Sequence, residues 1–399
     1  MALSRLHARL EALCAIAPLP PQGACRMALT EADKAGRDLF AGWVAEAGLS
    51  LTIDAVGNMF ALKAGTNPAL APVMSGSHLD TVATGGRFDG ALGVLAALAV
   101  AETMAPSPRG LCVANFTNEE GARFAPDMLG SLVAVGGLSV AAARATEGVD
   151  GVALGEALDG IGYAGAGTGP IPPHAFVELH VEQGPVLHEA DAPLAAVIGV
   201  QGISWRSVVF EGEANHAGAT PQRLRKDAGR SAIEFAAAAL ALPERFGDEL
   251  LVTVGRVVME PSLINVIPAR ASVTVDLRHP DAQTLAEADA AVEALAAAGT
   301  VTPLARFDPV VFDPRVVDVI DHAAAGRGLS ARRMISGAGH DAQMLARVCP
   351  AAMIFAPSID GISHNPAEAT DAADIDAAVM VLADVIATLC QKETPWPAS

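Results

Sequence analysis

From Leu49 onward, short apolar runs alternate along the chain with longer runs rich in alanine and leucine. Residues 73–77 and 111–117 predict two buried strands, because each is a brief, nearly continuous apolar run. The segment between them, residues 90–104, is long enough and rich enough in alanine and leucine to predict a helix. Strands that alternate with helices in this way are typical of an α/β domain whose sheet is largely parallel.

A glycine-dense passage, residues 151–173, interrupts this pattern before a further predicted strand at residues 176–180. The pattern then changes between residues 205 and 312, where the apolar positions indicate antiparallel strands. The elements expected there follow the order strand, helix, strand, strand, helix: residues 208–212, 227–242, 251–257, 272–278 and 282–298. This order indicates a βαββαβ-like α+β insert that is small enough to be a separate domain.

The α/β pattern returns after Asp313 with a helix, a glycine-rich turn, a strand at residues 351–355 and a closing helix at residues 375–389. We therefore predict an α/β fold with a discontinuous main domain, residues 1–205 and 313–399, built on a mixed, mostly parallel sheet. Residues 206–312 are predicted to form the smaller α+β domain that interrupts it. The chain is expected to begin with an amphipathic helix, because leucines recur at helical spacing at positions 3, 6, 10 and 13.

Composition and charge exclude several classes of protein. The chain has 399 residues, with 26 Lys and Arg against 45 Asp and Glu, a net charge of −19. Such an excess of carboxylates opposes nucleic-acid binding, which needs a basic surface. Hydrophobic residues make up 51% of the chain, but no apolar run approaches the ~20 residues that cross a bilayer. The five scattered cysteines predict reduced thiols, so a cytoplasmic protein is expected.

Polar residues that can bind metals lie at the ends of the predicted parallel strands, where α/β sheets place their ligands. His78 ends the first strand, and Asp80, two residues further along an extended chain, suits a carboxylate that fixes the imidazole tautomer. Asp89 lies in a glycine-flanked turn before a helix, a good place for a bridging carboxylate. Taken alone, His78 could instead be a hydrogen-bonded histidine at a strand end.

Two adjacent carboxylates, Glu119 and Glu120, follow the second strand. Placing both at the mouth of a buried strand is electrostatically costly unless cations are near or one of them takes a proton. The cost is resolved if one carboxylate binds metal and the other acts as a general base on water. The alternative is a solvated acidic turn that caps the next helix.

Two further segments add histidines. Glu178, His180 and Glu182 share one face of a predicted strand, which an apolar core strand would not allow without a polar site to face. His364 lies in a loop that Pro366 stops from continuing as a strand. Together, five residues suit a carboxylate-bridged site for two divalent ions about 3.5–4 Å apart: His78, Asp89, Glu120, His180 and His364. His340 is a competing histidine, and the glycines around it favour a place beside the ligands.

Seven motifs occur in the order found in one superfamily of enzymes: GSHLDT at 76–81, GGRFDG at 85–90, NEEGARF at 118–124, ELHVEQGP at 178–185, ANHAG at 214–218, SGAGHDA at 336–342 and GISHNPAE at 361–368. By these motifs the chain resembles the M20 metallopeptidase superfamily, and more narrowly its amidase, hydantoinase and carbamoylase branch. That branch includes N-carbamoyl-L-amino-acid hydrolases, β-ureidopropionases and allantoate amidohydrolases. The likeness extends from LTEADKAGRD at 29–38 to Glu368, and His180, where peptidase branches usually have an acid, favours this branch.

The resemblance implies two metal sites that share one carboxylate: His78, Asp89 and His180 in one, and Asp89, Glu120 and His364 in the other. It implies that Glu119 is the general base and that Asp80 orients His78. Two divalent ions per subunit are therefore expected. Zn²⁺ and Mn²⁺ are the first candidates, and Co²⁺ and Ni²⁺ are further ones, because mixed histidine and carboxylate ligands suit several metals.

The implied substrate contacts are Gln183, His216, Asn265, Arg278 and the backbone of Gly339. In the family, the histidine matched by His216 reaches the active site of the partner subunit and binds the reacting carbonyl oxygen, which implies a homodimer. Asn265 and Arg278 would hold the substrate carboxylate, Arg278 as a bidentate fork. From the residues alone, Arg278 could instead pair with Asp276, and Asn265 could be a turn residue. Ala219 and Ala369 replace a usual threonine and a common aromatic residue, and both changes concern the substrate side-chain pocket.

The implied activity is metal-dependent hydrolysis of the carbamoyl C–N bond of an N-carbamoyl amino acid, which releases the amino acid, carbon dioxide and ammonia. The partner would be a small ureido acid, and neither nucleic acid nor membrane is expected. Allantoate hydrolysis is the sister activity, because it would use the same catalytic residues. An aminopeptidase or deacylase of the superfamily and a non-catalytic binding protein that kept the fold are the remaining candidates. A non-catalytic protein is expected to have lost a ligand, and all five ligands are present.

Overall fold

The computed structural model describes residues 2–394 and residue 396. The chain divides into two compact units, one formed by Met1–Ile198 with Phe312–Ser399 and the other by Gly199–Val311. The second unit starts at Gly199, a few residues before the predicted limit at residue 206. The difference arises because its first strand, expected at residues 208–212, already begins at Gly202.

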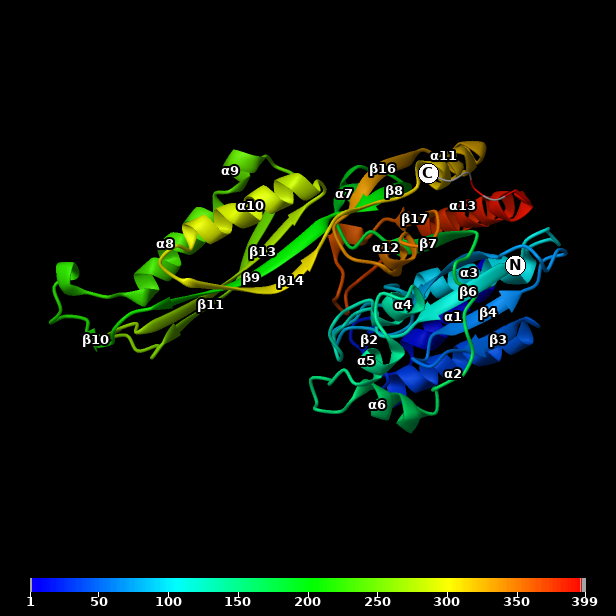
Figure 1. Cartoon of the computed structure of the whole chain (residues 1–399). Coiled ribbons are helices and arrows are strands. Elements are labelled where there is room, and N and C mark those ends of the chain that lie inside the picture. The colour runs from blue at the N-terminus through cyan, green and yellow to red at the C-terminus, as the bar shows by residue number, and fades with distance from the viewer. Residues whose placement is uncertain (1, 395, 397–399) are drawn as a thin grey trace. The chain divides into compact units, whose positions relative to one another are not determined.

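The first unit is built on a long mixed sheet (Figure 1). Its four central strands pair in parallel in the order β17 (Ala351–Ala356), β7 (Ala175–Val181), β5 (Val73–His78) and β6 (Leu111–Phe116). Antiparallel strands continue the sheet on either side: β8 (Leu194–Val200) beside β17, then β4 (Met59–Lys63) and β3 (Ser50–Ile53) beyond β6. Strand β16 (Ala331–Ser336) pairs with β8. The predicted α/β fold with a mixed sheet is confirmed, and its parallel pairs lie at the centre.

Helix α3 (Ala91–Thr103) is buried along its whole length from Ala91 to Ala101. A helix that is apolar all round needs cover on every side. Strands β5, β6 and β7 supply it on one side, and helices α1 (Ala2–Cys14) and α13 (Ala372–Gln391) pack against it as well. The other helical segments of this unit are α2 (Glu31–Glu46), α4 (Leu129–Ala134), α5 (Val140–Arg144), α6 (Leu154–Ile161), α7 (Val186–Glu189), α11 (Pro314–Gly326), α12 (Asp341–Leu345) and η2 (Ile359–Gly361), and a short ribbon joins β1 (Pro18–Leu19) to β2 (Gly23–Ala24).

Helices α2 and α6 are among those that lie outside the predicted elements. Helix α6 falls in the glycine-dense passage 151–173, and its buried Leu154, Leu158 and Ile161 recur at helical spacing. Helix α2 begins at Thr30, whose side chain accepts a hydrogen bond from the backbone N–H of Asp33. Both helices therefore had local signals, an apolar periodicity in one and an N-cap in the other.

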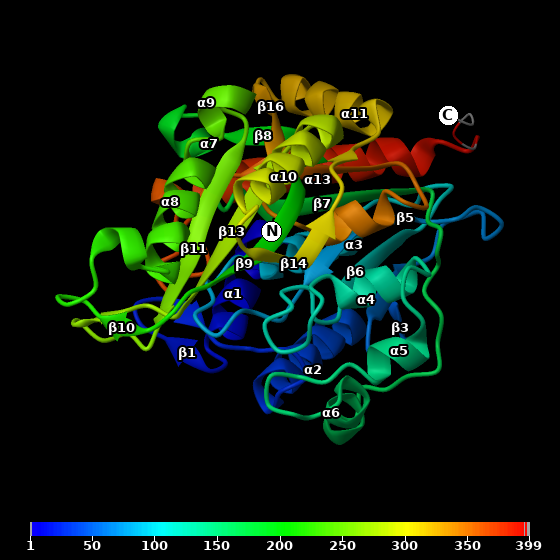
Figure 2. The ribbon, with the colours of Figure 1, turned by 60° about the vertical axis from the view of Figure 1, so that its left-hand side comes forward.

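The second unit is a four-stranded antiparallel sheet in the order β11 (Leu251–Glu260), β13 (Arg270–His279), β9 (Gly202–Glu211) and β14 (Thr300–Phe307) (Figure 2). Helices α8 (Ala228–Leu240) and α10 (Ala282–Leu295) complete the expected βαββαβ order. Residues of β13 alternate between buried and partly exposed, and its buried side chains join those of both helices in one core. The remaining short elements are β10 (Asn215–His216), η1 (Gln222–Leu224), α9 (Pro243–Phe246), β12 (Val266–Ile267) and β15 (Val310–Val311).

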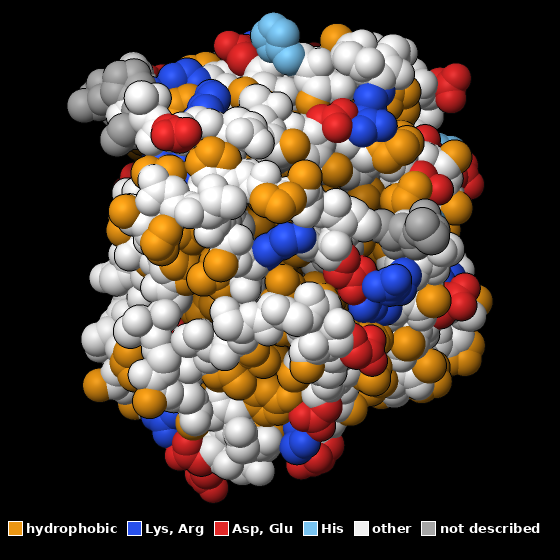
Figure 3. All heavy atoms as spheres, turned by 90° about the vertical axis from the view of Figure 1, so that its right-hand side faces the viewer, with side chains coloured by type: hydrophobic (Ala, Val, Ile, Leu, Met, Phe, Trp, Pro, Cys, Tyr) orange, Lys and Arg blue, Asp and Glu red, His pale blue; other side chains and the backbone are white. Residues whose placement is uncertain are grey.

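The charged side chains can be followed on one face of the molecule (Figure 3). On the face shown in Figure 3, acidic and basic side chains are interspersed, and those described there form no basic patch. Within residues 2–394, no helix is both long and apolar enough to cross a bilayer.

Candidate metal centre

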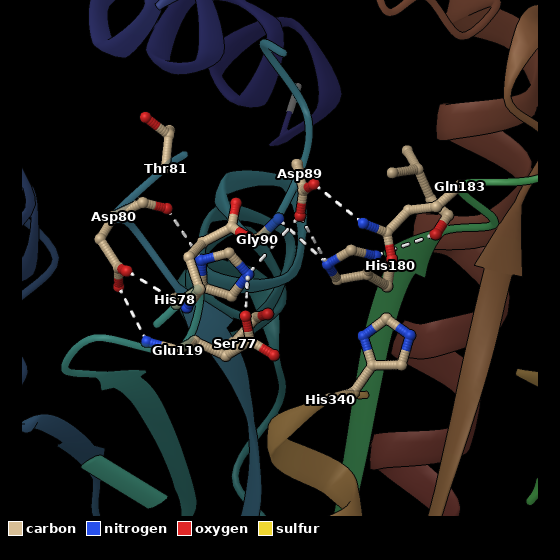
Figure 4. A network of polar contacts seen from close by, with 12 residues as sticks. Ser77, His78, Asp80, Thr81, Asp89, Gly90, Glu119, His180, Gln183 and His340 are labelled. Carbon is tan, nitrogen blue, oxygen red and sulfur yellow. Dashed lines mark hydrogen bonds and ion pairs between the residues drawn. The ribbon is translucent and has the colours of Figure 1, made fainter. Parts of the chain in front are cut away.

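The predicted metal ligands meet at the carboxyl ends of three neighbouring parallel strands, β5, β6 and β7 (Figure 4). His78 is the last residue of β5, Glu120 lies in the loop that follows β6, and His180 is the penultimate residue of β7. Asp89 lies immediately before Gly90, the N-cap of α3, and His364 follows η2. The ends of adjacent parallel strands lie at one edge of the sheet, so residues far apart in sequence come together there.

His78, His180 and Asp89 form one group of potential ligands, and all three are buried. The Nε2 atoms of His78 and His180 lie 3.6 and 3.2 Å from Oδ1 of Asp89. An ion with ligands at about 2.0–2.2 Å in tetrahedral array separates neighbouring ligand atoms by about 3.3–3.6 Å. The donor atoms of this group therefore have the spacing of a metal site.

A second group consists of Asp89, Glu120 and His364. The Nε2 atom of His364 lies 3.4 Å from Oδ2 of Asp89 and 3.2 Å from Oε2 of Glu120. Asp89 thus turns one oxygen toward each group, as a bridging carboxylate must. The His364 side chain is 50% exposed whereas that of Asp89 is 3% exposed, so the centre is open on the His364 side.

Backbone carbonyls fix the tautomers of the two buried histidines. Nδ1 of His78 lies 2.9 Å from the carbonyl oxygen of Asp80, and Nδ1 of His180 lies 2.9 Å from that of Val181. In its neutral form each ring donates from Nδ1 to such a partner, so its Nε2 is then unprotonated and can bind a cation. The N–H of Gly90 donates to Nε2 of His180 at 3.1 Å, which agrees with this tautomer.

The contact predicted between the Asp80 carboxylate and the His78 ring is made instead by the Asp80 carbonyl oxygen. The carboxylate accepts from the backbone N–H groups of Glu119 and Glu120, at 3.3 and 3.4 Å. Strand β5 ends at His78, so the extended alternation that would place both side chains on one face does not continue. Asp80 therefore orients His78 through its backbone and the two glutamates through its side chain.

The two adjacent glutamates point to different parts of the centre. Glu120 Oε2 faces His364, and its Oε1 accepts from the N–H of Val82 at 3.2 Å. Glu119 Oε2 lies 3.4 Å from Nε2 of His78, but Glu119 belongs to neither group of ligands. It is therefore close to the centre while its carboxylate is available for another task.

The pKa values of two carboxylates of the centre are shifted in opposite directions. Burial works against the charge of Asp89, but hydrogen bonds with His180, His364 and His78 hold its pKa well below the ordinary value. Burial raises the pKa of Glu119 well above the ordinary value, and the attraction of His78 does not offset it. When the environments of two acids move their pKa values apart in this way, one stays an anion and the other can exchange protons.

Polar residues around His180 brace the site. Glu178 accepts from Ser77 Oγ at 2.6 Å and from the N–H of Ala342 at 2.9 Å, and Nε2 of His340 lies 3.0 Å from Ser336 Oγ. Glu178, His180 and His340 are also close enough to hold an ion, but hydrogen bonds already use both carboxylate oxygens of Glu178, both ring nitrogens of His180 and Nε2 of His340. His340 therefore lies beside the ligands, as predicted.

The prediction that Glu182 shares the polar face of Glu178 and His180 is wrong. Strand β7 ends at Val181, and the Glu182 carboxylate accepts from the N–H groups of Val186 and Leu187 at 2.8 and 2.7 Å. Glu182 therefore caps the start of α7.

Two predicted substrate contacts lie in the first unit. Gln183 donates from Nε2 to Oδ2 of Asp89 at 3.0 Å, so it touches the bridging carboxylate itself (Figure 4). Gly339 lies in the turn before α12, where an added Cβ would come within 3.0 Å of Met128.

The other predicted substrate contacts lie in the second unit, at two separate places. His216 and Asn265 are neighbours, because β10 pairs with β12 and the N–H of Ala217 donates to the carbonyl of Asn265 at 3.0 Å. Arg278 lies near the far end of β13 and makes a bidentate ion pair with Asp276 at 3.0–3.2 Å. The ion pair considered as an alternative from the sequence is therefore present.

Sequence reasoning gave no role to Glu368, the last residue of the seventh motif. Its carboxylate is buried and accepts from the N–H groups of Phe88 and Asp89 and from Ser363 Oγ. Only its place in a motif rich in site residues signalled these contacts, because the N–H group of Phe88 lies 280 positions away in the sequence.

Comparison with known proteins agrees with this geometry. The family model described as Peptidase family M20/M25/M40 matches residues 74–388. An N-carbamoyl-L-amino-acid amidohydrolase of Rhizobium meliloti is 38% identical over 377 residues, which cover 91% of each chain. An allantoate amidohydrolase of Bacillus subtilis (strain 168) is 35% identical over 85% of this chain and 86% of its own. The crystal structure of an amidase of the hydantoinase/carbamoylase family from Burkholderia multivorans has a TM-score of 0.91 and 39% identity, with 98% of both chains covered.

The matched region includes every potential ligand from His78 to His364. The resemblance found in the seven motifs is thereby confirmed, both for the superfamily and for its hydantoinase and carbamoylase branch. The chain belongs to peptidase family M20/M25/M40.

Proposed function

We propose that this protein hydrolyses the carbamoyl C–N bond of an N-carbamoyl amino acid and releases the amino acid, carbon dioxide and ammonia. The observation that carries the proposal is the pair of ligand groups joined by Asp89, with Glu119 beside them and outside both. The likeness to amidohydrolases that are named for N-carbamoyl-L-amino acids supports this substrate class.

Two divalent cations are the proposed cofactors, Zn²⁺ or Mn²⁺ first and Co²⁺ or Ni²⁺ as further candidates. His78, Asp89 and His180 would hold one, and Asp89, Glu120 and His364 the other. When bound, such a pair acidifies water and stabilises negative charge on the substrate oxygen. The spacing of the donors supports this assignment, as do the backbone carbonyls that face Nδ1 of His78 and His180 and so turn Nε2 of each ring toward Asp89.

Glu119 is the proposed general base. Burial raises its pKa, so it can take a proton from the attacking water and later give that proton to the leaving amine. Asp80 would hold Glu119 in place, because its carboxylate accepts from the Glu119 N–H.

His216 is proposed to bind the reacting carbonyl oxygen. Its Nδ1 accepts from the N–H groups of Gly218 and Ala219 at 3.0 and 3.2 Å, so the neutral ring has its proton on Nε2. An exposed Nε2–H is the donor that an oxyanion requires.

Substrate recognition is proposed to need two chains. Arg278 and Arg270 lie eight positions apart on β13, and at about 3.3 Å per residue this separates them by about 26 Å. His216 and Asn265 lie near the Arg270 end, because β12 ends only three residues before Arg270. One small ureido acid cannot reach both ends, so a site that uses Arg278 from one chain would take His216 and Asn265 from the other.

The second unit has a surface that suits such a homodimer. Strand β11 is an edge of its four-stranded sheet, and Leu251 and Val257 on it are 52% and 46% exposed. Helix α8 exposes Ile233 and Leu240. Unpaired edge strands readily pair with another chain. A cytoplasmic location is also proposed, since all five cysteines are free thiols.

A substrate panel tests the proposal. Ammonia release would be measured with N-carbamoyl-α-amino acids, β-ureidopropionate and allantoate, each with added Mn²⁺, Zn²⁺ or Co²⁺. We expect the N-carbamoyl amino acids to be the best substrates. Allantoate is the second candidate because of the 35% identical relative, and turnover of allantoate alone would select that activity instead. No ammonia from any substrate would refute both.

A further inference from the structure

Glu368 is completely buried, yet it takes no part in the reaction proposed above. Its Oε1 accepts from the backbone N–H groups of Phe88 and Asp89 at 2.9 and 3.2 Å. Its Oε2 accepts from Ser363 Oγ at 3.0 Å. The donors belong to two loops, residues 85–90, which contain Asp89, and residues 361–368, which contain His364.

We propose that Glu368 is a positioning residue that locks these two loops together and so sets the distance between Asp89 and His364. The inference rests on the proposed metal-dependent function. Asp89 donates its own N–H to this carboxylate, and Ser363 immediately precedes His364 in the chain. One buried side chain thereby holds the backbone of the shared ligand and the neighbour of the exposed ligand.

The loop of His364 needs such support. His364 has a φ of 52°, in the left-handed region that costs free energy for a residue other than glycine. Thr84 Oγ1 donates to the carbonyl of His364 at 3.0 Å, and Gln22 Nε2 donates to the carbonyl of Glu368 at 2.9 Å. These contacts hold the loop from outside, and the Glu368 carboxylate ties it to Asp89.

Gly86 is shaped to this carboxylate. A Cβ added at Gly86 would lie 2.2 Å from the carboxylate carbon and Oε1 of Glu368. The two loops therefore approach so closely that no other side chain fits at position 86 while Glu368 keeps its place. An alanine there would push the carboxylate away from its donors without removing it.

Three variants separate the hydrogen bonds of Glu368 from its bulk. Glu368→Ala removes every contact. Glu368→Gln keeps them, because its amide oxygen can accept from Phe88 and Asp89 and its amide nitrogen can donate to Ser363. Gly86→Ala displaces the carboxylate by collision. Glu102→Gln is the matched control. Glu102 lies in the last turn of α3, at the end of the helix opposite Asp89, and its buried carboxylate pairs with Arg9.

The affinity of chelator-treated protein for Co²⁺ would be measured by visible absorption, with ammonia release as a second readout. We expect Glu368→Ala to bind about 10–100-fold more weakly, as when groups that orient a metal ligand are removed. Glu368→Gln and Glu102→Gln should stay near wild type. Gly86→Ala should weaken binding in wild type and have little further effect in Glu368→Ala, because the collision partner is gone.

The outcomes distinguish this inference from the proposed function. If wild type binds no Co²⁺, the metal-dependent function fails. If wild type binds Co²⁺ and Glu368→Ala binds it equally well, the positioning role is wrong. Equal losses in Glu368→Gln and Glu368→Ala would also overturn it. If Glu368→Ala loses the circular dichroism spectrum of a folded protein, the other two variants decide the question. The positioning role then requires weaker Co²⁺ binding in Gly86→Ala and near wild-type binding in Glu368→Gln, and wild-type binding in Gly86→Ala would overturn it.

Discussion

The metal centre of the first unit and the predicted substrate groups of the second unit are organised in opposite ways. Around the centre, Asp89, His78 and His180 are buried and each is held by backbone or side-chain hydrogen bonds. In the second unit, His216 and Asn265 are exposed on short elements of two residues and an adjoining turn. The comparison teaches that this chain preorganises the side chains that could hold cations, whereas the groups proposed to bind substrate are exposed and, in the proposal, need a second chain.

The largest effect is expected at the residue shared by both ligand groups. Asp89→Asn keeps the shape of the side chain but removes the charge that faces His180 and His364. We expect both cations to be lost and ammonia release to fall below detection. Glu120→Gln changes one group alone and should leave one ion bound. Metal analysis of the two purified variants checks this contrast, and equal metal contents would contradict a shared ligand.

Glu119→Gln tests whether the same region separates binding from chemistry. Glu119 lies outside both ligand groups, so the metal content should remain that of wild type. Loss of the general base should lower kcat by about 10²–10⁴-fold. A variant that keeps wild-type kcat would refute the role of Glu119 as base, and one that loses its metal would make it a ligand.

Mixed dimers test the dependence of the second region on a partner. His216→Ala alone should lower kcat by about 10²–10³-fold, as for loss of an oxyanion donor. When it is mixed and refolded with Glu119→Gln, half of the dimers are mixed, and each has one site with both residues intact. Activity should therefore recover to about a quarter of wild type. No recovery in a mixture shown to contain mixed dimers would mean that His216 does not act across subunits.

The smallest effect is expected at Arg278, whose bidentate geometry is already used by Asp276. Arg278→Lys should raise KM by about tenfold, because lysine cannot form the fork that matches a carboxylate. Asp276→Asn is the control, and it should leave KM nearly unchanged. If both variants raise KM equally, the ion pair itself is what matters, and Arg278 has no direct part in binding the substrate.

The sequence could bring the candidate ligands together because several of them lie at or just after strand ends. His78 is the last residue of β5 and His180 the penultimate residue of β7, and the parallel pairing of these neighbouring strands brings them together. The sequence could not show which atom of Asp80 contacts His78. The carbonyl oxygen of Asp80 can reach the ring because the strand ends at His78, and the sequence did not fix where the strand ends. Glu368 was missed for another reason: the N–H of Asp89 lies 279 positions away, and no local pattern encodes such a contact.

The same limits applied to the fold. The βαββαβ order of the second unit followed from apolar periodicity in strands such as β13. Helix α6 was hidden by the glycines around it, although its buried positions keep helical spacing. Local rules therefore identify elements with a strong periodicity and fail where glycine masks it.

The proposed chemistry as a whole depends on cations held by Asp89 and its neighbours. The most direct test is the ammonia released from an N-carbamoyl amino acid by chelator-treated protein as Mn²⁺ or Co²⁺ is added in known amounts. We predict no activity without metal, and a rise that reaches its plateau at two ions per chain. Ammonia release that is unchanged by chelation, or none at any metal content, would contradict this dependence.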